Sequence, residues 1–106
     1  MPVGRSFLSM SLRRERTVSF IVWGPILRGD IPGLTARVCR LLEQNAADVA
    51  LCEVRNVVVP DAVTVEALAR LQLGAQRHRC RVILLHASEE LLDLVAFMGL
   101  SDVIAG

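Results

Sequence analysis

Apolar residues occupy every second position between residues 17 and 23. This spacing predicts a β-strand with one well-buried face. Two short apolar runs, Val49–Val54 and Arg81–His86, predict further strands, and the run Val57–Val59 before Pro60 predicts a strand that leads into a loop. The side chains expected on the buried face of the first strand are Val18, Phe20 and Val22.

Three segments that follow these strands have apolar residues at helical spacing. The first begins after Asp30, a candidate N-cap, with Pro32 in its first turn. The second runs over about Thr64–Arg79, and the third follows Ser88 and ends before Gly99, where a left-handed cap is expected. The positions expected to face the core are, helix by helix, Ile31, Leu34, Val38, Leu41 and Leu42, then Val65, Leu68, Leu71, Gln72 and Ala75, and finally Leu91, Leu94, Val95 and Met98. The opposite side of the second helix is expected to carry Glu66, Arg70, Gly74 and Arg77.

The alternation of strands and helices predicts an α/β fold. We expect a single-layer mixed, largely parallel β-sheet with amphipathic helices packed on it. The length of 106 residues suits one domain, which we place at residues 17–106. Residues 1–16 are rich in Arg, with Glu15 as their one acid, and we expect a disordered leader; a nucleic-acid-binding arm is the alternative.

The amino-acid composition limits which binding partners and which cellular compartment we expect. The net charge of +1, from 12 Arg and no Lys, gives no general attraction to nucleic acid or anionic lipid. The cysteines Cys39, Cys52 and Cys80 form no CxxC pair, which argues against disulfides and a zinc site and favours buried thiols in a reducing compartment. No apolar run is long enough to span a bilayer and no signal peptide is evident, so we expect a cytoplasmic protein without direct membrane insertion.

Reactive groups are few, and we expect a protein that is not an enzyme and needs no metal or cofactor. The sequence contains none of the common nucleophile, phosphate-loop or zinc motifs. His86 ends a predicted strand, where it either bonds to backbone at the surface or lines a small-molecule pocket. Glu89 and Glu90 fit the dipole of the third helix.

The stretch Asp61–Glu66 offers a second candidate site. It places a carboxylate and the Thr64 hydroxyl where the second helix begins, and helix N-termini favour anions, including a phosphate on Thr64. The simpler alternative is that Asp61 or Thr64 caps the helix.

From Val49 to Ile104 the sequence resembles the STAS domain, which is shared by anti-sigma factor antagonists and the cytoplasmic tails of sulphate transporters. The resemblance lies in the strand–helix register, in Asp61 before a helix, and in the closing segment HASEELLDLVAFMGLSDVI. It implies that the hydroxyl two residues after the acid is phosphorylated by an anti-sigma factor kinase. Here that position holds Val63, and the family's Gly is replaced by Thr64.

Two explanations of this departure stay open. Either Thr64 serves as the acceptor, or phosphoregulation has been lost. We favour loss, because moving one residue along a helix rotates the side chain by about 100°.

The resemblance implies a regulatory module that captures a protein partner. We expect an anti-sigma factor or related protein, with an effect on transcription; the alternative is a soluble accessory subunit of an ABC-type lipid transporter. A third hypothesis is a small-molecule sensor that uses a pocket near His86.

Phe97 is either exposed as part of a binding patch or covered by the segment Val103–Ile104. The residues expected to form the partner-binding surface are Asp61, Thr64, Glu66, Arg70 and Phe97.

Overall fold

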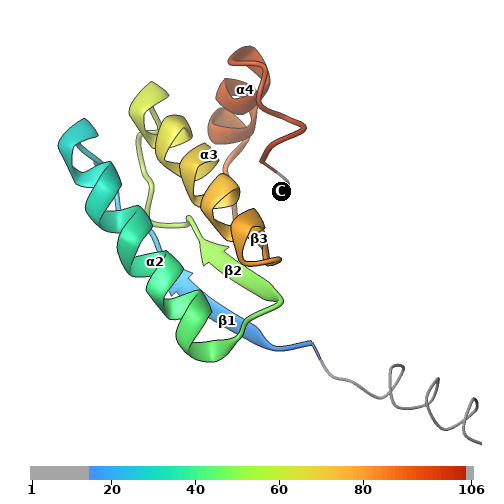
Figure 1. The fold of residues 1–106 in the computed structure, drawn as a ribbon. Coiled ribbons are helices and arrows are strands. Elements are labelled where there is room, and N and C mark those ends of the chain that lie inside the picture. Colours follow the sequence, from blue (N-terminus) through green and yellow to red (C-terminus); the bar gives the residue numbers. More distant parts are fainter. Residues whose placement is uncertain (1–14, 105–106) are drawn as a thin grey trace, which may run out of the picture.

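A computed structural model describes residues 15–104. The expected order of strand, helix, strand, helix, strand, helix is confirmed over this range (Figure 1). The elements are β1 (Thr17–Ile21), the 3-10 helix η1 (Arg28–Asp30), α2 (Ile31–Asn45), β2 (Val49–Glu53), α3 (Ala62–Arg77), β3 (Arg81–Leu85) and α4 (Glu89–Phe97).

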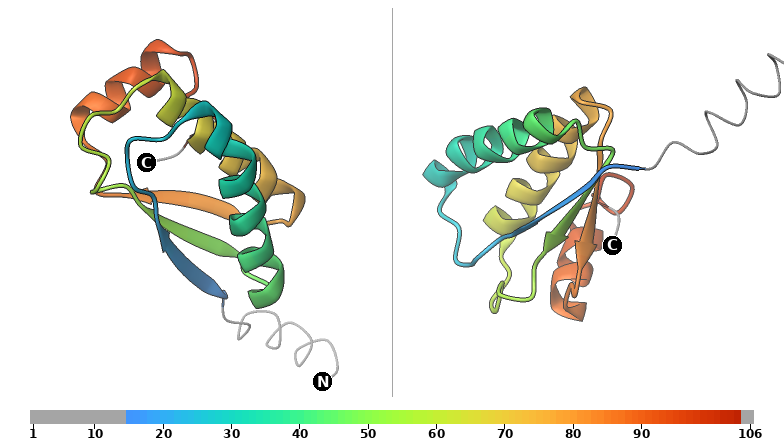
Figure 2. Two further views of the ribbon diagram at one scale, coloured as in Figure 1. Left: turned by 90° about the vertical axis from the view of Figure 1, so that its left-hand side faces the viewer. Right: turned by 90° about the horizontal axis from the view of Figure 1, so that it is seen from below.

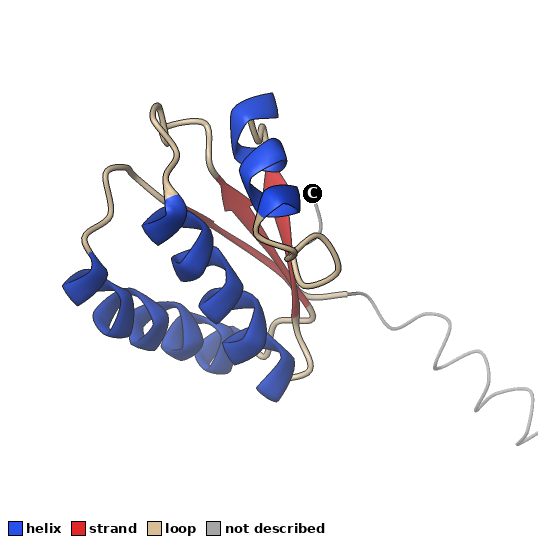
Figure 3. Ribbon diagram, turned by 90° about the horizontal axis from the view of Figure 1, so that it is seen from above, coloured by secondary structure: helices blue, strands red, loops and turns tan. Residues whose placement is uncertain are grey.

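The sheet is a small parallel one of order β1-β2-β3. Among the described residues both strand pairs are parallel, so the α/β prediction holds while the mixed sheet that we allowed for is not found. The helices α2 and α3 lie side by side over one face of the sheet (Figure 2). In contrast to our expectation that all three helices pack on the sheet, α4 lies at the carboxyl end of the strands and packs chiefly on α3 (Figure 3).

The core lies between the sheet and the two long helices. In register, Ala50 pairs with Val18 and Val82, and Cys52 pairs with Phe20 and Leu84. The side chains of β2 and β3 in these two rows are buried, and those of β1 are half-buried. Most of the helix positions expected to face the core are buried: Ile31, Val38, Leu42, Val65, Leu68, Leu71, Gln72, Ala75, Leu91 and Val95. Of the others, Leu34, Leu41 and Leu94 are half-buried, and the expectation for Met98 is wrong because this residue is exposed at the end of α4.

Cysteine chemistry follows from this packing. The three cysteines are free thiols. Cys52 is fully buried, and burial together with the neighbouring Glu53 carboxylate raises the pKa of its thiol to about 12. A thiol with so high a pKa is an inert core side chain at neutral pH.

Local rules explain most of the helix ends. Ser88 accepts a hydrogen bond from the amide of Leu91 at 3.1 Å, as expected for an N-cap. At the other end of α4, Gly99 has φ +73° and donates to the Ala96 carbonyl, while Leu100 donates to the Val95 carbonyl. These two bonds form a Schellman motif, so the left-handed cap predicted at Gly99 is confirmed.

Asp30 occupies the N-cap position of α2 as predicted, but its carboxylate makes no capping bond and accepts instead from the Leu27 amide at 3.3 Å. Two further local predictions are wrong. The run Val57–Val59 is loop rather than strand. Gly74, expected on the exposed side of its helix, is buried because α2 packs there: a Cβ at Gly74 would lie 3.0 Å from the Cys39 sulfur.

The predicted leader falls almost entirely on residues 1–14, outside the described part of the chain. Of its last two residues, Arg16 accepts from the amides of Asp48 and Val49 and donates its own amide to the Asp48 carboxylate at 2.9 Å. Residue 16 is therefore attached to the turn before β2. No helix within residues 15–104 is long and apolar enough to cross a bilayer.

Candidate functional site

The loop before α3 presents apolar side chains to solvent. Val57 is buried and anchors the loop, and its amide donates to the Val54 carbonyl at 3.0 Å. Val58 and Val59 follow with 80% and 76% of their surfaces exposed. Single exposed apolar residues are common, and here two adjacent β-branched side chains are exposed together before a helix N-terminus.

Asp61 is the N-cap of α3. Its backbone is extended, and its Oδ1 accepts from the Thr64 amide at 2.8 Å and from the Thr64 hydroxyl at 2.9 Å. The hydrogen bond from the amide, and next the one from the hydroxyl, hold the pKa of the Asp61 carboxyl below its usual range. The side chain is exposed, so the capped carboxylate also faces solvent.

Thr64, in contrast to Asp61, is buried. Only 1% of the residue is exposed, and its hydroxyl is used in the bond to Asp61. A kinase would have to open the first turn of α3 to reach this oxygen. A phosphate there would also lie against the Asp61 carboxylate, which would repel it.

Glu66 and Arg70 form a charged group with a residue that the sequence analysis did not single out. The Glu66 carboxylate pairs with the guanidinium of Arg28 on η1, and its second oxygen lies 3.6 Å from Arg70 Nε. The Glu66–Arg70 pair has the i,i+4 spacing that was expected. Arg28 is 38 residues away along the chain, so only the tertiary fold brings it here.

Phe97 ends α4 and is 88% exposed. The segment that we considered as a cover does not cover it: Ile104 is itself buried in the core and Val103 is half-buried. The helix α4 packs on α3, so Phe97 ends a helix that neighbours the one that Asp61 caps (Figure 1).

We group these residues as the α3 entry surface. Four of the five predicted site residues contribute exposed or half-exposed atoms to it, and the fifth, Thr64, supports it from beneath. The surface consists of Val58, Val59, Asp61, Glu66, Arg70, Phe97 and, from η1, Arg28.

A second polar cluster lies where β2 and β3 end. His86 Nδ1 is 2.8 Å from Glu53 Oε1, and the Arg55 guanidinium lies 3.1 Å from the same His86 nitrogen. Desolvation raises the pKa of the Glu53 carboxyl, but the hydrogen bonds from His86 and from the Arg55 amide outweigh it, and the net pKa is lowered. The expectation that His86 bonds to backbone is wrong, because its ring contacts the side chains of Glu53 and Arg55.

Of this second cluster, only His86 was considered in the sequence analysis as a candidate site residue. Glu53 is the one charged residue in its apolar run, which could have marked it as a partner for His86 on the neighbouring strand end. All its members are surface groups that pair with one another, and within residues 15–104 no group of three metal-ligating side chains is found.

The fold and these surfaces define a small parallel α/β domain with a capped helix entrance between exposed apolar side chains. No model of a known protein family matches the chain. A search of curated proteins likewise finds no match.

Proposed function

We propose that this chain is a STAS-type, non-catalytic module that captures a protein partner through the α3 entry surface. The partner class that we favour is an anti-sigma factor or a related kinase-like protein, so that capture would modulate transcription. The proposal is supported by the position of Asp61 at the entrance of α3 and by the resemblance over residues 49–104.

The observation that carries the proposal is the composition of the surface. Val58 and Val59 in the loop before α3 and Phe97 at the end of α4 are exposed apolar side chains. Arg28, Glu66 and Arg70 form an ion-paired group on the side of α3 that faces α2, and Asp61 caps the same helix. Exposed apolar side chains together with Arg are typical of protein–protein interfaces. Aromatic and Arg side chains, both present here, are the residues that most often dominate binding energy.

The burial of Thr64 favours capture that does not depend on phosphorylation. Its hydroxyl is inaccessible and committed to Asp61, and Val63 at the family's acceptor position has no hydroxyl. Constitutive binding, regulated by the supply of partner, fits these residues better than a phosphate switch.

Co-purification with surface variants tests the proposal. The tagged full chain is expected to recover a specific partner, identified by mass spectrometry, and Val58→Asp and Arg70→Glu are expected to reduce recovery at least about tenfold, the effect of losing one interface anchor. Both side chains are exposed, so both variants should fold. Arg40→Glu, a charge reversal on the exposed side of α2, is the matched control.

The outcomes separate the alternatives. Recovery of an anti-sigma factor that is lost in both variants and kept in the control supports the proposal. Recovery of ABC permease or ATPase subunits through the same residues replaces it with the transporter alternative. Equal recovery by all variants removes the α3 entry surface as the binding site.

A further inference from the structure

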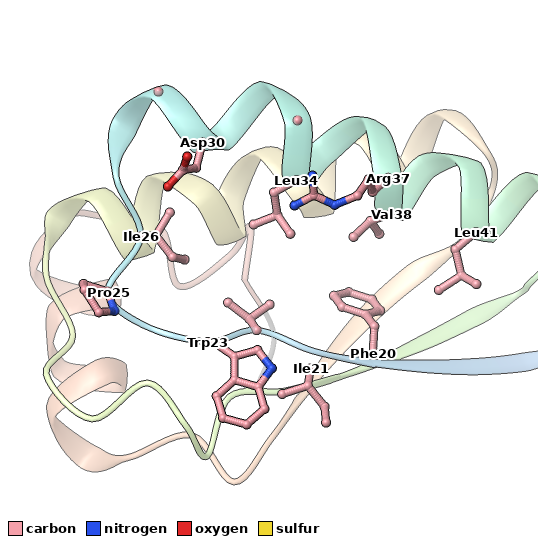
Figure 4. A pocket seen from close by; sticks show the side chains of 13 residues that line it. Phe20, Ile21, Trp23, Pro25, Ile26, Asp30, Leu34, Arg37, Val38 and Leu41 are labelled. Carbon is pink, nitrogen blue, oxygen red and sulfur yellow. The ribbon is translucent and has the colours of Figure 1, made fainter.

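A cavity opens between β1 and α2. Its volume is about 640 Å³, and it lies at the carboxyl end of β1 beside the start of α2 (Figure 4). Small-molecule sites in proteins commonly span about 300–1,000 Å³ and, in parallel α/β sheets, lie at the carboxyl ends of strands. Phe20, Ile26, Leu34 and Val38 form apolar walls, and Trp23 lies at the opening with 65% of its surface exposed.

Two positions that line the cavity have no side chain. A Cβ at Gly29 would meet nothing within 4 Å, and a Cβ at Gly33 would meet only the Arg37 guanidinium, at 3.5 Å. Neither glycine has the positive φ that would require glycine for backbone reasons. A larger side chain at position 33 would therefore take up space beside Arg37 without meeting the backbone.

Arg37 supplies the charge of the cavity. It follows Gly33 by one helical turn, and its guanidinium turns back along α2 toward Leu34 and the cavity (Figure 4). Within residues 15–104 this guanidinium has neither a hydrogen-bond nor an ion-pair partner. The guanidinium groups of Arg40, Arg77 and Arg79 in the same range likewise have no such partner, but none of these three residues lines the cavity. Asp30, at the other end of the cavity, accepts from the Leu27 amide and is too far along the helix to neutralise Arg37.

We propose that this cavity binds an amphiphilic carboxylate, of the class of medium-chain fatty acids. The carboxylate would pair with the Arg37 guanidinium, whose planar donors suit two parallel hydrogen bonds. The alkyl chain would lie in the space beside Gly29 and Gly33, against Phe20 and Leu34. Its far end would contact Trp23.

The fluorescence of Trp23 can be used to measure ligand binding to this cavity. Trp23 is the only tryptophan of a chain without tyrosine, so its emission reports on this cavity alone. Titration with decanoate, below its micelle-forming concentration, is expected to shift the emission to shorter wavelength in a saturable way, because the indole loses contact with water. Decanol, which matches the chain and lacks the charge, is expected to bind about tenfold more weakly, the loss of one charge-assisted pair.

Two variants and a control make the test specific. Arg37→Gln is expected to weaken decanoate binding about tenfold and to leave decanol binding unchanged. Gly33→Leu fills the cavity with a better helix former and is expected to abolish both shifts in a chain that remains folded by circular dichroism. Arg40→Gln, an exposed position of α2 outside the cavity, is expected to behave as the unaltered chain.

The proposal is overturned if decanol binds as tightly as decanoate, or if Arg37→Gln binds decanoate as well as Arg40→Gln does. It is equally overturned if no saturable shift occurs with decanoate and Trp23 responds only to an added protein. Because no residue of the α3 entry surface is involved, none of these results bears on partner capture.

Discussion

Asp61 and Thr64 satisfy each other, and this arrangement decides what the start of α3 can do. One carboxylate oxygen accepts from both the amide and the hydroxyl of Thr64. The other carboxylate atoms remain at the surface. The same residue can therefore stabilise the helix and contact a partner.

Replacing Asp61 with Ala should lower the free energy of unfolding by about 1 kcal/mol at pH 7, the usual cost of losing an N-cap. Asp61→Asn keeps a capping oxygen and should cost only a few tenths of a kcal/mol. Urea denaturation of the three proteins measures both differences. Equal stability of Asp61→Ala and the unaltered chain would contradict the capping role.

The pH dependence of this pair has a defined sign. Because the folded-state pKa of Asp61 is lowered, its charge stabilises the fold fully above the ordinary Asp pKa of about 3.9. That contribution disappears as the pH falls through the lowered folded-state pKa. The difference between the unaltered chain and Asp61→Asn should therefore shrink below about pH 4.

Thr64 should tolerate the loss of its hydroxyl far better than the gain of a charge. Thr64→Val removes one hydrogen bond while keeping the side-chain volume, and should cost about 1 kcal/mol of unfolding free energy. Thr64→Glu, which imitates a phosphate, buries a charge beside Asp61 and should unfold the start of α3. Thermal unfolding followed by circular dichroism compares them, and a fully stable Thr64→Glu would reopen phosphorylation at this site.

At the scale of elements, Gln72 shows how α3 is attached to the sheet. Its buried side-chain amide donates to the Val82 carbonyl at 3.1 Å and accepts from the Val82 amide at 2.9 Å. The Gln72 side chain thus satisfies both backbone groups of a β3 residue, as a neighbouring strand would. This explains why a polar residue occupies a core position of the helix.

Gln72→Met should cost about 2–4 kcal/mol, because it leaves the Val82 amide and carbonyl without partners at similar side-chain volume. Gln76→Met, on the exposed side of the same helix, is the matched control and should change stability by less than about 0.5 kcal/mol. Chemical denaturation measures both. A cost for Gln72→Met no larger than that of the control would show that the two bonds contribute little.

The end of α4 offers a second element-scale prediction. Gly99→Ala forces a Cβ into a left-handed backbone at φ +73° and should cost about 1–2 kcal/mol. Gly29→Ala, at a glycine without positive φ and with open space around it, should cost less or stabilise. Thermal unfolding compares the two, and a neutral Gly99→Ala would mean that α4 ends differently in solution.

Elements were predictable where a local pattern decides them. The alternation in β1, the helical spacing in α2 and α3, and the caps at Ser88 and Gly99 are short-range features of the sequence. The failures have tertiary causes. Gly74 is buried by the neighbouring helix, and Val58 and Val59 have strand propensity but no strand beside them to pair with.

The candidate site was predictable to the same extent. Asp61, Glu66 and Arg70 follow from their positions on one helix, and their residue types identify the polar entrance of α3. Arg28 and the Glu53–His86 pair depend on contacts between segments more than 30 residues apart, which no local pattern specifies.

At the scale of the whole molecule, the two proposed sites use different residues but lie near each other. Both are at the carboxyl end of the parallel sheet, and η1 contributes Arg28 to the α3 entry surface and Gly29 and Asp30 to the cavity. Variants at Val58 and at Arg37, each of which belongs to one site, test partner capture and ligand binding separately.

The most direct test of partner capture is an NMR footprint of the identified partner on the isotope-labelled chain. We predict that the amides of residues 58–66, Arg70 and Phe97 shift or broaden on complex formation, while those around the exposed Arg40 of α2 do not. A footprint that leaves residues 58–66 unchanged and falls on another face would contradict the account.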